Sequence, residues 1–84
     1  MAGKNTPLLD LHGKNIEQAL KLVDAFLHQH SHGNHHVIKI MTGKGSGKIL
    51  GEVKKYLKQA GYPFRFESLP NGKQNKGVLD IFMN

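Results

Sequence analysis

Cysteine is absent from this sequence, and acidic residues are few. Without cysteine the chain forms neither a disulfide nor a thiolate metal site, and it carries no mark of a secreted scaffold held by disulfides. No apolar run approaches the roughly 20 residues that cross a bilayer, and residues 1–5 lack the apolar stretch of a signal peptide. These absences predict a cytoplasmic protein that makes no membrane contact.

The charge balance is the first positive feature. Lysine and arginine number 12 against six aspartates and glutamates, which gives a formal net charge of +6 with neutral histidines. Such an excess attracts polyanions, and nucleic acid is the commonest of them. The simpler interpretation is that the charge only keeps a small domain in solution. A chain of 84 residues makes one domain with a thin core and no room for a deep cofactor cavity.

The hydrophobic pattern predicts six elements in the order β-α-β-α-β-β. Asn15 followed by Gln18 is typical of a helix start with a capping box, and Gly61 is typical of a helix end. Strands are expected over 8–12, 37–41, 64–66 and 78–83, and helices over about 16–30 and 48–60.

The remaining segments are predicted to be irregular. Residues 1–7 are expected to form a flexible lead-in to a single domain over 8–84. Residues 70–77 are expected to form a flexible polar loop, whose Lys73 and Lys76 could clasp a nucleic-acid strand, although loop length alone indicates mobility. The sequence shows no internal repeat and no second domain.

The first strand indicates how the layers are arranged. Leu9 and Leu11 are expected on one side, with Asp10 and His12 on the other. This alternation predicts a sheet covered by helices on one face only, because parallel strands buried on both faces are continuously apolar. Two β-α-β units predict parallel strands with right-handed crossovers. The fold class is therefore α/β, with two helices on one face of a four-stranded sheet.

A glycine-rich loop, Thr42-Gly43-Lys44-Gly45-Ser46-Gly47, joins the second strand to the second helix. Glycines let a ligand approach the backbone closely, and a helix N-terminus offers N–H groups and a positive dipole to an anion. The simpler interpretation is a flexible turn between a strand and a helix. The pattern favours phosphate binding, by Thr42, Gly43, Lys44, Gly45, Ser46, Gly47 and Lys48.

This loop does not match the known nucleotide motifs. A P-loop needs Gly-Lys followed by Ser or Thr, but Ile49 follows Gly47-Lys48. The dinucleotide pattern G-x-G-x-x-G fails because Lys48 stands where the third glycine belongs. We therefore expect no nucleotide and no organic cofactor.

Asp10 and His12 are the candidate catalytic residues. They fall near the carboxyl end of the first strand, and the glycine-rich loop falls at the carboxyl end of the second. Open α/β sheets bind ligands at this edge. Phosphodiester cleavage needs a proton carrier, which His12 suits, while Asp10 could orient it or hold a metal. Lys44 and the loop N–H groups suit stabilisation of the charged transition state. A strand-end histidine in an ordinary hydrogen bond is the simpler alternative.

Five of the six histidines lie in the tract His28–His36. Histidine-rich tracts can bind Zn, Ni or Cu. This tract contains no carboxylate and straddles a predicted helix end, so nothing fixes four ligands. We expect a solvated loop with weak metal affinity, and we assign no metal-ligating residues.

Three features taken together resemble one known family. Leu9-Asp10-Leu11-His12-Gly13, Thr42-Gly43-Lys44-Gly45 and the final strand led by Gly77 are similar to the signatures of the Smr family, the small MutS-related domain. The likeness covers about residues 8–83, with both main motifs in the family's order and spacing.

The resemblance implies a two-layer fold like the C-terminal domain of translation initiation factor three, with a mixed sheet whose last strand is antiparallel to the others. It implies DNA or RNA binding, with nicking or endonuclease activity in several members. By this resemblance Asp10 and His12 match the motif tied to cleavage, and Gly43, Lys44 and Gly45 match the second motif. Many members have histidine where this chain has Thr42. Some are attached to a MutS-like ATPase, so the chain is expected to be either a stand-alone Smr protein or a domain of a larger parent chain, and a protein partner is also considered.

Two functions follow as hypotheses. The first is an endonuclease that acts on DNA or RNA, assisted by a divalent metal such as Mg²⁺ or Mn²⁺. The second is a non-catalytic module that binds nucleic acid or docks a partner in repair, recombination or RNA quality control. A third, a metal-binding or protein-interaction domain built on the histidine tract, would bind without the steep salt dependence of phosphate contacts.

Overall fold

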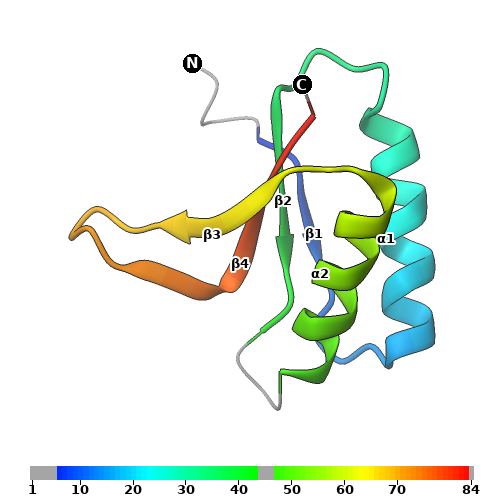
Figure 1. Cartoon of the computed structure of the whole chain (residues 1–84), viewed down its shortest axis with the longest axis horizontal. Helices are drawn as coiled ribbons and strands as arrows, with labels where there is room; N and C mark the ends of the chain where they lie inside the picture. Colours follow the sequence, from blue (N-terminus) through cyan, green and yellow to red (C-terminus); the bar gives the residue numbers. More distant parts are fainter. Residues whose placement is uncertain (1–5, 44–46, 84) are drawn as a thin grey trace.

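A computed structural model describes residues 6–43 and 47–83. The elements follow the predicted order, and Figure 1 shows the two helices on one side of the sheet. The α/β, two-layer prediction is confirmed. The bounds are β1 Leu8–Asp10, α1 Ile16–His30, β2 Val37–Met41, α2 Lys48–Ala60, β3 Phe64–Ser68 and β4 Gln74–Phe82.

The sheet is mixed, with strand order β1-β2-β4-β3. β1 and β2 are parallel, and β4 runs antiparallel to both of its neighbours. The last strand therefore inserts between two strands that precede it in the chain. The antiparallel last strand that the family resemblance implied is confirmed.

Both helices begin and end where the sequence predicts. The side chain of Asn15 accepts a hydrogen bond from the backbone N–H of Gln18 at 2.8 Å, and the Gln18 side chain accepts from the Asn15 backbone N–H at 3.1 Å. This is a complete capping box. At its C-terminus, α2 is capped by Gly61, which has a φ of 82°. Glycine suits this left-handed position because it has no Cβ.

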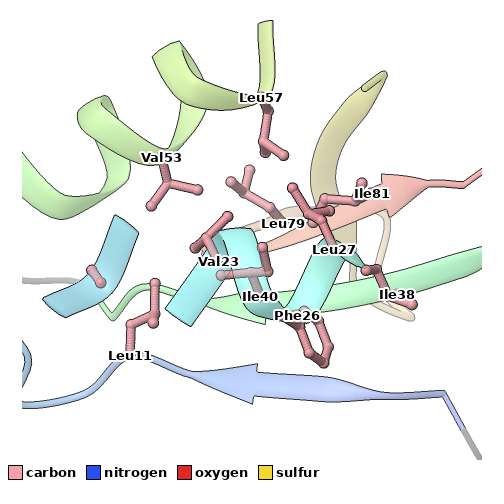
Figure 2. Packing of buried hydrophobic residues seen from close by; sticks show 11 residues of the cluster. Leu11, Val23, Phe26, Leu27, Ile38, Ile40, Val53, Leu57, Leu79 and Ile81 are labelled. Carbon is pink, nitrogen blue, oxygen red and sulfur yellow. The ribbon is translucent and has the colours of Figure 1, made fainter. Parts of the chain in front are cut away.

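The core lies between the helices and the sheet (Figure 2). Alternate residues of β2 and β4 point into it, and they meet Leu11 beside β1 and the inner stripes of both helices. The largest fully buried side chains are Leu11, Val23, Ile38, Ile40, Val53, Leu57, Leu79 and Ile81. Ile16 and Ala60 are exposed because they are the first residue of α1 and the last residue of α2.

Several predicted strand boundaries are wrong, and the third strand, expected over 64–66, continues to Ser68. The first strand ends at Asp10 rather than at residue 12, because the chain turns there. The predicted loop over 70–77 is shorter, because β4 already begins at Gln74 and pairs with β3. Of the predicted lead-in, Thr6 and Pro7 lie within the described residues, and the Pro7 carbonyl accepts a hydrogen bond from the Lys39 N–H at 2.9 Å. Neither helix in the described part of the chain has the length and apolar character that a membrane crossing requires.

Candidate functional site

The carboxyl ends of β1 and β2 lie side by side. Asp10 pairs with Met41, and one residue further the Leu11 N–H donates to the Met41 carbonyl at 2.9 Å. Thr42 and Gly43 come directly after this pair in the sequence. The start of the glycine-rich loop is thus adjacent to the Asp10–His12 segment, as parallel neighbouring strands require.

Asp10 and His12 are linked through a turn. The backbone N–H of His12 donates to Oδ1 of Asp10 at 2.9 Å, and the Lys14 N–H donates to the Leu11 carbonyl at 3.1 Å. Gly13 follows with a φ of 77°. His12 therefore lies beyond the end of β1 rather than on it, although it is exposed like Asp10, as the alternation predicts. The turn leaves Leu11 buried and His12 exposed to solvent, where an imidazole can reach a ligand.

The head of the glycine-rich loop is fastened to β4. The Gly77 carbonyl accepts hydrogen bonds from the Thr42 N–H at 2.8 Å and from the Gly43 N–H at 3.3 Å. The Thr42 hydroxyl lies 3.5 Å from the same carbonyl and 3.3 Å from the Gly43 carbonyl. Gly43 has a φ of 82°, a left-handed conformation that favours glycine. Gly77 was not among the residues predicted for the site, although a glycine at the head of the last strand was a visible signal.

The far end of the loop opens α2. Gly47 is the N-cap with a φ of 84°, and among the described residues no side chain caps this terminus. The first turn of α2 contains no acidic residue, and Lys48 begins the helix. The positive end of the helix dipole is therefore not offset by a carboxylate within its own first turn. Lys44, Gly45 and Ser46, also predicted for the site, lie outside the described residues.

The sheet face opposite the helices carries a polar network that the sequence did not lead us to expect. Lys39 Nζ lies 2.8 Å from Oδ1 of Asp80 and 2.9 Å from Oε2 of Glu67. Arg65 lies 3.7 Å from the second Asp80 oxygen, and Asp80 is only 6% exposed. Charged residues between buried isoleucines and leucines, as at Lys39 and Asp80, were the signal for such a network.

The network shifts the pKa of two of its members. Burial lowers the pKa of Lys39, but hydrogen bonds and charges from Asp80 and Glu67 together outweigh it, and the net pKa is raised. The hydrogen bond from Lys39 lowers the pKa of Glu67 despite the opposing effect of burial. Opposite charges in contact favour both ionised forms. The network therefore stabilises the sheet as a set of ion pairs.

The histidine tract lies at the opposite end of β2 from the glycine-rich loop, because β2 begins just after it, at Val37. The ring of His30 stacks edge-on against Phe26, with centroids 4.8 Å apart, and against His35 at 5.9 Å. Within residues 6–43 and 47–83, no three side chains of His, Asp or Glu gather as a metal site. The tract thus contains the last turn of α1 and folds back so that His35 contacts His30.

Comparison with known proteins gives a consistent family relationship. Residues 9–84 match the family model described as the Smr domain. The chain is 36% identical over 69 residues to Endonuclease MutS2 of Streptococcus thermophilus, a match that covers 82% of this chain and 9% of that protein. It is 39% identical over 70 residues to Endonuclease MutS2 of Helicobacter pylori, covering 83% of this chain and 9% of the relative. The chain therefore spans only about a tenth of these relatives.

A solved structure shares the fold. The Smr domain of Thermus thermophilus MutS2 superimposes with a TM-score of 0.77, over 92% of this chain and 96% of that one. The two sequences are 23% identical. At this identity the likeness establishes the architecture, and the chemistry has to be argued from the residues of this chain.

Proposed function

Since this chain belongs to the Smr domain family, we propose that it binds DNA or RNA at the edge where β1 and β2 end, and that it cleaves phosphodiester bonds there. His12 is the proton carrier in this proposal. Thr42, Gly43 and the N-terminus of α2 hold the phosphate, together with the loop residues Lys44, Gly45 and Ser46.

One observation carries the proposal. The pairing of Asp10 with Met41 brings the exposed His12 segment beside the start of the glycine-rich loop. The loop is fixed at its head by Gly77 and at its far end by α2. A phosphate at this edge would meet an imidazole on one side and a helix dipole on the other. The net charge of +6 favours the approach of any nucleic acid.

The residues have separate tasks in hydrolysis. A water oxygen forms a new bond to phosphorus while the bond from phosphorus to the leaving sugar oxygen breaks. A proton leaves the water, and another reaches the leaving oxygen; His12 suits one of these transfers. The backbone amides at the N-terminus of α2 and the lysine side chains stabilise the additional negative charge on the phosphoryl oxygens, because the Thr42 and Gly43 N–H groups already donate to the Gly77 carbonyl. Asp10 acts as a positioning residue, because it holds the turn that presents His12.

The described residues do not form a metal centre by themselves. No three potential ligands gather among them, and one oxygen of Asp10 already accepts the His12 N–H. Mg²⁺ commonly uses one or two carboxylates together with substrate phosphates, so bound nucleic acid would have to complete any such site. We derive no step through a metal, and we propose Mg²⁺ or Mn²⁺ only as conditions for the assay.

The test compares the purified chain with two histidine variants. Supercoiled plasmid and structured RNA are incubated with Mg²⁺, Mn²⁺ or EDTA, and products are separated on gels. His12→Ala should lose cutting by at least the roughly 10²-fold that a general acid or base contributes, yet still bind. His32→Ala, an exposed histidine at the opposite end of β2, is the matched control and should cut as wild type does.

The outcomes separate the two functions. If wild type binds nucleic acid with strong salt dependence but neither wild type nor His12→Ala cuts under any condition, the chain is a binding module. If His12→Ala cuts as well as wild type, His12 is not the proton carrier. Absence of salt-dependent binding by wild type would contradict the whole proposal.

A further inference from the structure

The hairpin formed by β3 and β4 extends beyond the two-layer body (Figure 1). We define the hairpin arm as residues Ser68–Lys76. No residue of the arm belongs to the buried core. β2 pairs with β4 over Val78–Phe82 only. Within the described residues, Gln74 and Asn75 pair with Ser68 and Glu67 of β3, and the register shifts between Phe66 and Glu67, so Lys76 lies in the irregular part of β4. Packing of the body does not account for this extension.

We infer that the hairpin arm is a second contact for nucleic acid, in which Lys73 and Lys76 bind backbone phosphates that flank the phosphate held at the β1–β2 edge. The inference rests on the proposed function and adds to it. It assigns to this chain a binding surface outside both sequence motifs.

The base of the arm is rigidly anchored. Asn75 donates from its amide to Oε1 of Glu67 at 3.1 Å, and its Oδ1 accepts the Gly77 N–H at 3.0 Å. Glu67 is in turn bound by Lys39 of β2. These bonds tie both strands of the arm to the centre of the sheet. The direction in which the arm leaves the body is thus fixed by its own side chains.

The tip of the arm is an ordered turn. The Leu69 N–H donates to the Lys73 carbonyl at 2.8 Å, and the Gly72 N–H donates to the Leu69 carbonyl at 2.9 Å. Oδ1 of Asn71 accepts the Lys73 N–H at 3.0 Å. Gly72 has a φ of 85°, which glycine adopts without strain. The tip of the arm is therefore a hydrogen-bonded turn.

The charge of the arm has one sign. Residues 68–76 contain Lys73 and Lys76 and no aspartate or glutamate. Both lysines are exposed. The acidic residue nearest in sequence, Glu67, is neutralised by Lys39 at 2.9 Å. A projecting arm with two cations suits a polyanion and would repel a basic partner.

The arm begins beside the site. Gly77 joins it to the body, and the Gly77 carbonyl is the group that fastens Thr42 and Gly43. Lys73 lies four residues from Gly77 along the chain, a separation of at most roughly 13 Å. This reach corresponds to about four nucleotide steps along a duplex axis. A strand lying across the β1–β2 edge can therefore contact the arm without moving the fold.

The experiment measures affinity against salt for Lys73→Gln/Lys76→Gln. The probes are a labelled DNA duplex, an RNA duplex of the same sequence, and the corresponding single strands. Loss of two phosphate contacts should weaken binding on the order of tenfold and reduce the slope of log K against log salt by about 1.8 on duplex DNA. Lys73→Arg/Lys76→Arg should bind as wild type, because the charges are kept.

The matched control is Lys55→Gln/Lys58→Gln. These lysines are also exposed, but they lie on α2, and the variant has the same net charge as the arm variant. It should keep the wild-type slope. If both glutamine variants lose the same affinity, only net charge matters and the inference about the arm fails while the proposed function stands. If wild type does not bind any probe, the proposed function fails and the arm inference fails with it.

Discussion

The side chain of Asp10 accepts the backbone N–H of His12 at 2.9 Å, so the two residues of this motif are joined through the main chain. The bond ends β1 and turns the chain so that Leu11 enters the core while His12 faces solvent. The Asp10 carboxylate therefore fixes a turn that contains both a buried leucine and the exposed imidazole of His12, the candidate catalytic group.

Two variants of Asp10 distinguish the effect of its hydrogen bond to His12 from the effect of its negative charge. Asp10→Asn keeps an oxygen that can accept the His12 N–H, and we expect this variant to cut nearly as well as wild type. Asp10→Ala removes the acceptor, and the loss of such a bond, about 1–2 kcal/mol, predicts a decrease in cutting on the order of tenfold. Nicking rates and the midpoint of urea unfolding check both variants. Equal inactivity of the two would show that the negative charge is the essential property.

Acid should weaken the ion pairs of Lys39 with Glu67 and Asp80, on the sheet face opposite the helices. The pKa of Glu67 is lowered from 4.5 by its hydrogen bond with Lys39. A carboxyl with a lowered pKa contributes stability that is present above its unfolded pKa and is lost as pH falls through the folded value. We expect the free energy of unfolding of wild type to fall below about pH 4.5, and Glu67→Gln to show a shallower fall. Urea unfolding at a series of pH values measures this, and identical acid profiles for the two proteins would contradict it.

Alkali should weaken the contact between the helices. The Tyr56 hydroxyl of α2 donates to Asp24 of α1, and this hydrogen bond, followed by burial, raises the pKa of Tyr56 from 10.0 to about 12. The neutral phenol is the stabilising form, so its contribution is full below pH 10 and is lost as pH rises towards 12. Tyr56→Phe should lose about 1 kcal/mol at neutral pH and lack this alkaline decline. Tyr62→Phe is the control, and it should keep the decline.

One added methyl group should have opposite effects at two glycines. Gly51 lies inside α2, and a Cβ there would meet nothing within 4 Å, so Gly51→Ala should stabilise the protein by about 0.5–1 kcal/mol. Gly43 has a φ of 82°, so Gly43→Ala should cost about 1–2 kcal/mol and weaken nucleic-acid binding. Thermal unfolding and binding titrations measure both. A stabilising Gly43→Ala would show that the loop head does not need its left-handed conformation.

Local rules were sufficient for most of the secondary structure. The capping box of Asn15 and Gln18, the terminal Gly61 and the apolar stripes of both helices depend on residues within a few positions of one another. The two candidate motifs were found for the same reason, since each is a short contiguous segment. Their meeting at one edge also followed, because consecutive parallel strands end on the same side.

The errors arose where the outcome depends on distant residues. Whether β1 continues to His12 is decided by the competition between further pairing and the Asp10 side chain, which the alternating pattern does not reveal. Gln74 to Lys76 are polar and carry no strand signal of their own. Gln74 and Asn75 are extended because they pair with Ser68 and Glu67 of β3, and the Asn75 amide bonds to Glu67 across the hairpin.

The sequence by itself determined the order of the elements, the helix limits, the excess of positive charge and the location of both motifs, because these depend on composition and on near neighbours in the chain. Only the tertiary structure decided that β4 lies between β2 and β3, that Lys39 faces Asp80 and Glu67, and that Gly77 fastens Thr42 and Gly43. The contacts of Lys39 and Thr42 join residues 28 to 41 positions apart. Their pairing is selected by the packing of the whole core, which no local pattern encodes.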